Sequence, residues 1–115
     1  MRNDPLSELS LSFAVSVVHL VKTLKLKKES VISNQIGRSG TSIGANIREA
    51  QYAQSKADFI SKLQIALKEA NETGYWLELL VKTDYISKDE YRSLNAECAR
   101  LRVMLISSLR TAKGE

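Results

Sequence analysis

Four long segments of the chain carry apolar residues at alternating spacings of three and four, and this pattern limits the possible folds more than any other feature. In an α-helix, such spacing places the apolar side chains on one face. The sequence therefore predicts helices over residues 5–26, 30–53, 56–83 and 87–112. Because 115 residues are too few for two independent cores, we expect one all-α domain, residues 1–115, folded as an antiparallel four-helix bundle.

Capping signals support the starts of three of these helices. Asp4 precedes Pro5, the one proline of the chain, and a proline at the first helical position loses no hydrogen bond. Ser87 and Glu90 form a capping-box pattern, and Ser55 with Asp58 forms a similar one. The connection between the last two predicted helices is short, so we expect these two helices to lie antiparallel.

Glycines interrupt the second predicted helix, where each costs about 1 kcal/mol relative to alanine. Gly37, Gly40 and Gly44 nevertheless share one helical face with Ser33. Small residues on one face let a neighbouring helix approach closely, which would compensate for the lost helix propensity. A loop over residues 37–44 is the alternative interpretation.

The first predicted helix is more apolar than one subunit requires. Outside its main stripe it also carries Leu11, Val15 and Val18, and large exposed apolar patches usually mark interfaces. On the third helix, Trp76 and Leu80 are expected off the core face, together with Ile65 and Leu79. We predict self-association through Leu11, Val15, Val18, Trp76 and Leu80; the alternative is that the first helix is central in a splayed bundle.

No motif in the sequence indicates catalysis, a metal site or a bound cofactor. The one cysteine, Cys98, keeps the apolar phase of its helix and is expected to be buried and unreactive. The one histidine, His19, has no glutamate three residues before it, so the Glu-x-x-His pattern of di-iron bundles is missing. Glu69 and Glu72 are expected to pair with cations. We predict a non-enzymatic protein with no catalytic residues, metal or cofactor.

Basic residues suggest an interaction with an anionic partner. The net charge is +4 and the isoelectric point is about 9.3. At roughly 100° per residue, one arc of the last helix collects five cations without an acid. These are Lys88, Arg92, Arg102, Arg110 and Lys113, and a second cluster at the end of the first helix contains Lys22, Lys25, Lys27 and Lys28. This pattern predicts contacts to a phosphate backbone, whereas an ordinary solvated face is the alternative.

Two sequence strings resemble the four-helix-bundle proteins encoded in 23S ribosomal RNA intervening sequences. The first is RSGTSIGANIREA at residues 38–50, and the second combines SKADF at 55–59, IALKEA at 65–70 and YWLELL at 75–80. The resemblance implies a homopentameric barrel of four-helix subunits. It also implies kinship with the accessory variability protein of diversity-generating retroelements, which associates with nucleic acid and a reverse transcriptase. It further suggests that Asn46, Glu49 and Glu72 form hydrogen bonds between helices or subunits.

These observations predict a cytoplasmic homo-oligomeric scaffold that binds RNA or DNA through basic surfaces without sequence specificity. The alternative is an assembly that recruits a protein partner, such as a reverse-transcriptase-like protein, and whose basic surface is incidental. The N-terminus lacks the pattern of a signal peptide, and no run of about 18–20 consecutive apolar residues suggests a membrane span. We therefore expect no membrane partner.

Overall fold

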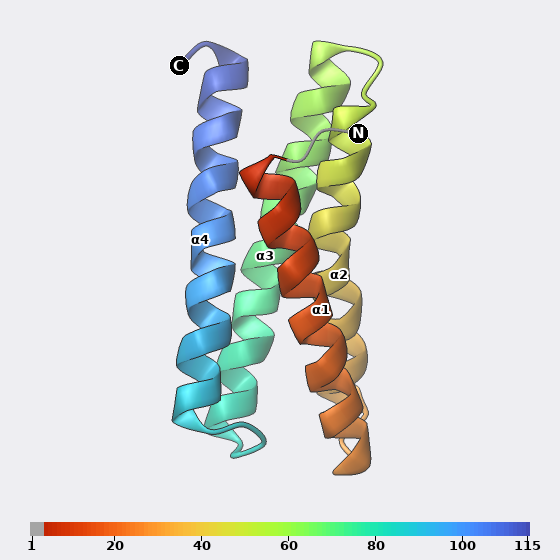
Figure 1. The fold of residues 1–115 in the computed structure, drawn as a ribbon, viewed down its shortest axis with the longest axis vertical. Helices are drawn as coiled ribbons and strands as arrows, with labels where there is room; N and C mark the ends of the chain where they lie inside the picture. Colours follow the sequence, from red (N-terminus) through yellow and green to blue (C-terminus); the bar gives the residue numbers. More distant parts are fainter. Residues whose placement is uncertain (1–3) are drawn as a thin grey trace.

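A computed structural model describes residues 4–115, which form four long helices (Figure 1). The helices are α1 (Pro5–Leu26), α2 (Val31–Gln51), α3 (Lys56–Lys82) and α4 (Lys88–Lys113). Every boundary lies within two residues of its predicted position, and the all-α, four-helix prediction is confirmed. The helices pack in cyclic order, α1 on α2, α2 on α3, α3 on α4 and α4 on α1.

Side chains cap the helices largely as the sequence predicts. Asp4 accepts a hydrogen bond from the Ser7 N–H at 2.8 Å, and Ser87 and Glu90 form a reciprocal capping box with two bonds of 3.0 Å. The start of α2 differs, because Ser30 makes no capping bond through its side chain. Instead the buried carboxylate of Glu29 accepts bonds from the first free N–H groups of α2.

The core runs along the bundle axis and draws on all four helices. Its fully buried side chains include Phe13 of α1, Ile43 of α2, Leu77 of α3 and Leu105 of α4. Among the described residues, α1 alone is long and apolar enough to cross a membrane. The core helix of a bundle passes the same test, so this composition is weak evidence for a membrane segment.

The glycines of α2 lie at its contact with α1. The helix is continuous from residue 31 to 51, so the alternative of a loop over 37–44 is wrong. A Cβ atom added to Gly40 would lie 2.8 Å from Val17 Cγ2, and one added to Gly44 would lie 3.2 Å from Ser10 Oγ. Their missing side chains therefore allow α1 and α2 to pack more closely than alanines would.

Candidate interaction surfaces

An apolar stripe on α1 faces solvent in the single subunit. Leu11 is 58% exposed, Val15 51% and Val18 43%, and we call these three residues the α1 stripe. Leu11 of this stripe also lines a groove of about 400 Å³ between α1 and α2, to which the small residues Gly44 and Ala45 contribute. Because the other helices leave the α1 stripe uncovered, the alternative of a central first helix is wrong.

The two α3 residues predicted at an oligomer interface behave differently from the α1 stripe. Leu80 is fully buried in the core of the subunit, so its predicted place off the core face is wrong. The reason is that α3 packs against both α2 and α4, which widens its buried arc beyond a single stripe. Trp76 is half-buried against this core, and its ring meets that of Tyr75 edge-on with the centroids 5.0 Å apart.

A polar cluster joins α2 to α3 beside Trp76. Arg38 pairs with Glu69 at 3.2 Å and also contacts Glu72, so the prediction that these glutamates pair with a cation is confirmed. The Trp76 Nε1–H donates to Glu72 at 3.0 Å. This hydrogen bond, and then the Arg38 contact, hold the pKa of Glu72 below its ordinary value of 4.5.

Other polar residues of α2 and α3 also form contacts within the chain. The Asn46 amide donates to the Ser42 carbonyl of its own helix at 2.8 Å, and Glu49 lies 3.8 Å from Lys62 of α3. Deeper inside, the Thr73 hydroxyl donates to Ser39 Oγ at 2.9 Å, where both residues are fully buried. The Glu49–Lys62 and Thr73–Ser39 contacts join α2 to α3 within one chain.

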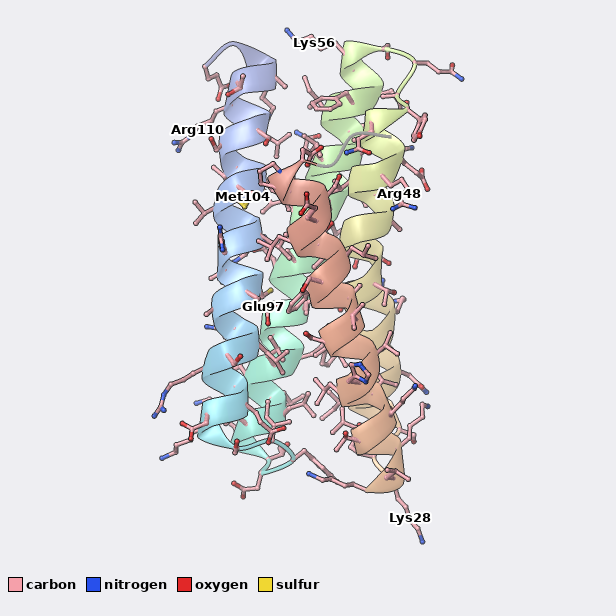
Figure 2. All side chains as sticks on the ribbon, viewed as in Figure 1. Lys28, Arg48, Lys56, Glu97, Met104 and Arg110 are labelled. Atoms are coloured by element: carbon pink, nitrogen blue, oxygen red, sulfur yellow. The ribbon has the colours of Figure 1, made fainter. Side chains whose placement is uncertain are left out.

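The predicted basic ridge of α4 is not continuous. Lys88 and Arg92 lie near the start of the helix, where Arg92 pairs with Asp89 at 2.7 Å. Arg110 and Lys113 lie near the opposite end (Figure 2). Arg102 was expected to make the ridge continuous between these two ends. It is half-buried and turned toward α3, so the structure separates the ridge into two clusters.

Small side chains on α3 explain the orientation of Arg102. Its Nη1 donates to the Cys98 sulfur at 3.3 Å, and a Cβ on Gly74 would come within 3.0 Å of that nitrogen. Cys98 is fully buried, as predicted, and its S–H donates to the Ala70 carbonyl. Burial raises the pKa of the Cys98 thiol although Arg102 opposes this effect.

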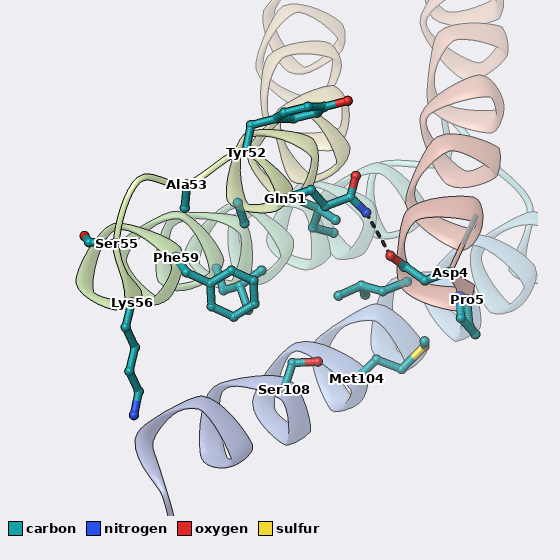
Figure 3. Close-up of a pocket in the computed structure, with 14 residues that line it drawn as sticks. Asp4, Pro5, Gln51, Tyr52, Ala53, Ser55, Lys56, Phe59, Met104 and Ser108 are labelled. Atoms are coloured by element: carbon teal, nitrogen blue, oxygen red, sulfur yellow. Dashed lines mark hydrogen bonds between the residues drawn. The ribbon is translucent and has the colours of Figure 1, made fainter. Parts of the chain in front are cut away.

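Sequence reasoning missed a cleft of about 940 Å³ at the end of the bundle where α3 begins (Figure 3). It exists because α1, with 22 residues, is shorter than α3 with 27 and α4 with 26. Its walls include Leu6, Phe59, Leu63 and Met104. At its rim the Gln51 amide donates to Asp4 at 2.8 Å, while the buried Gln51 Oε1 has no hydrogen-bond partner among residues 4–115.

The fold and these surfaces define an antiparallel four-helix bundle protein with an uncovered apolar stripe and separate clusters of cations. Residues 5–107 match the family model described as 23S rRNA-intervening sequence protein, and the chain belongs to that family.

One solved structure that the chain resembles is a protein of unknown function from the S23 ribosomal protein family of Bacteroides thetaiotaomicron VPI-5482. The two sequences are 57% identical, the match covers 91% of this chain and 98% of that one, and the TM-score is 0.90. The comparison with curated proteins yields no match.

Proposed function

We propose that this protein is a non-enzymatic, cytoplasmic, homo-oligomeric scaffold that binds RNA or DNA without sequence specificity. The observation that carries the proposal is the α1 stripe, three large apolar side chains that are 43–58% exposed on one helix. Apolar area left in water forgoes about 25 cal/mol per Å², and a second copy of the chain can cover it. We further propose five subunits in a closed barrel, in keeping with the family resemblance.

Positive charge supports the nucleic-acid part of the proposal. One chain carries a net charge of +4, so five copies at +4 each carry +20. Phosphate contacts of this kind depend on cation number and position rather than on base edges, so sequence preference should be small. An oligomer repeats each cationic cluster and raises the overall affinity through multivalency.

Light scattering on Val15→Asp tests the assembly. We expect wild-type protein to have several times the 12.8 kDa mass of one chain, and Val15→Asp to fall toward that mass because a buried unpaired charge is costly. The matched control is Val31→Asp, which makes the same substitution at a valine 74% exposed at the start of α2. A wild-type monomer at micromolar concentration, or assembly that survives Val15→Asp, would contradict the proposed role of the α1 stripe.

Salt titration tests nucleic-acid binding. The logarithm of the affinity for a structured RNA should fall linearly with the logarithm of the salt concentration. The reason is that lysine and arginine side chains that contact phosphates release the counterions bound there. Duplex DNA of unrelated sequence should compete. Absent binding at low salt, or binding that ignores salt, would refute this part of the proposal.

A second candidate function is recruitment of a protein partner, and the middle of α4 favours it. Val103 is 66% exposed and Ile106 40% exposed, between the two cationic clusters of that helix. Such a patch suits an apolar partner surface better than a phosphate backbone. Loss of a co-purifying partner in Val103→Asp, with RNA affinity unchanged, would support this second function.

A further inference from the structure

The turn between α1 and α2 concentrates cations more strongly than the predicted ridge does. Residues 22–34, which end α1, form the turn and begin α2, contain four lysines and one acidic residue, Glu29. Glu29 is buried, and its two carboxylate oxygens accept backbone N–H bonds at 3.0 and 2.8 Å. The exposed surface of this turn therefore carries cations without a matching acid. We use the name α1–α2 tip for the four exposed lysines in the last turns of α1 and in the turn that follows it. They are Lys22, Lys25, Lys27 and Lys28.

Two of the tip lysines are held in place by neutral partners. Lys25 Nζ donates to Asn34 Oδ1 at 2.9 Å, and Lys27 Nζ donates to the Tyr85 carbonyl at 2.9 Å. Within residues 4–115, none of the tip lysines forms an ion pair with a carboxylate. Their positive charge consequently stays available to an external anion. By contrast, the turn between α3 and α4 contains Asp84, and Asp89 follows in the first turn of α4.

Lys28 occupies a backbone conformation that ordinarily favours glycine. Its φ is +64°, in the left-handed region, where a side chain beyond Cα is sterically unfavourable. The side chain extends away from the body of the bundle (Figure 2). The negative end of the α1 dipole attracts a lysine here, but Lys25 and Lys27 already lie at that helix end. A lysine that lowers stability at an exposed tip points to a role in binding.

We infer that the α1–α2 tip is the surface that contacts the phosphate backbone of a nucleic acid, with Lys28 at its most extended point. This inference rests on the proposed nucleic-acid binding and moves the contact from the side of α4 to one end of the bundle. The start of α4 lies at the same end (Figure 1), with Lys88 and with Arg92, which pairs with Asp89. In a closed ring of subunits the tip is repeated once per subunit.

A nucleic acid fits this tip better than an anionic membrane does. Leu26 and Val31, which are 85% and 74% exposed, are the large apolar side chains at this turn. Together they offer less hydrocarbon than one myristoyl chain, and one such chain alone gives only marginal membrane binding. Phosphate binding depends instead on the number of cations, which the tip supplies.

Paired glycine substitutions test the inference, because the structure contains a second left-handed residue of opposite charge. Asp84, in the turn between α3 and α4, also has φ +64°. Lys28→Gly and Asp84→Gly should both raise Tm by a few degrees by relieving the same steric cost. Only Lys28→Gly should weaken binding to a structured RNA, and it should make the negative slope of log K against log salt less steep by roughly 0.7–0.9 per lysine in contact.

Lys56→Gln, which removes an exposed cation at the start of α3, at the opposite end of the bundle (Figure 2), should leave that slope within error of wild type. If wild-type protein shows no salt-dependent RNA binding, the proposed function fails and this inference fails with it. If wild type binds but Lys28→Gly binds equally well, only the inference fails. Tighter binding to vesicles containing 30% phosphatidylglycerol than to RNA, abolished by Leu26→Ser, would also overturn it.

Discussion

Gly40→Ala adds one methyl group at the closest contact between α1 and α2. The new Cβ would lie 2.8 and 2.9 Å from the two γ-methyl carbons of Val17, whereas non-bonded carbons prefer about 3.5–4.0 Å. Both residues are buried, and a valine in a helix has one strongly preferred rotamer. Val17 therefore has little freedom to turn aside, and α1 must move away from α2.

Two opposing effects set the magnitude. Alanine is better than glycine in a helix interior by about 1 kcal/mol. Overpacking a well-packed core costs about 1–3 kcal/mol, and two simultaneous methyl contacts on a stiff side chain place Gly40→Ala near the upper end of that range. The net loss should be about 2 kcal/mol, equivalent to a fall in Tm of roughly 5–10 °C for a domain of this size.

Urea and thermal unfolding followed by circular dichroism measure this loss, at one fixed protein concentration because self-association would shift the apparent stability. The matched control is Gly37→Ala, whose Cβ would meet only one γ-methyl of the half-buried Val21 at 3.3 Å. That variant should be neutral or slightly stabilised. A stability of Gly40→Ala equal to or above wild type would refute the reasoning.

A double-mutant cycle gives a second check on the same contact. Val17→Ala alone should destabilise by leaving a cavity, but combined with Gly40→Ala it should also remove the clash. The two substitutions should then cost less together than the sum of their separate costs, by more than about 0.5 kcal/mol. Simple additivity would show that the clash is relieved elsewhere.

Three further predictions concern the polar and thiol groups. The Trp76 N–H and Arg38 hold the pKa of Glu72 below 4.5, so they stabilise the fold above that pH and the effect is lost as the pH falls through the lowered pKa. Arg38→Gln should therefore show a smaller drop in urea midpoint between about pH 5 and pH 3 than wild type; an equal drop would contradict this. Ser39→Ala removes a buried hydrogen bond between α2 and α3 and should lower unfolding free energy by about 1 kcal/mol, measured by urea titration. Cys98 is fully buried and should react with a disulfide reagent at least ~100-fold more slowly in native protein than in denaturant; fast native reaction would show local opening.

The candidate surfaces differ in how far sequence alone could predict them. Exposure of Leu11, Val15 and Val18 followed from helical periodicity, because their arc exceeds what one face of a helix can bury. The same reasoning failed for Leu80. Periodicity counts apolar residues around one helix, but the number of neighbouring helices decides how wide the buried arc is.

Local signals alone determined the helical segments of this protein. Apolar spacing, Asp4 and the capping box of Ser87 and Glu90 act within a few residues along the chain, so they can be recognised without knowledge of the fold. The burial of Cys98 followed from the same spacing.

Only the tertiary structure decided which side chains meet across helices. Arg102 has the helical angle of the predicted basic ridge, yet Gly74 and Cys98 leave room for it to turn toward α3. The cleft beside Phe59 arises because α1 is shorter than α3 and α4. Such contacts join residues far apart in sequence, and their geometry depends on helix length, order and packing rather than on any local pattern.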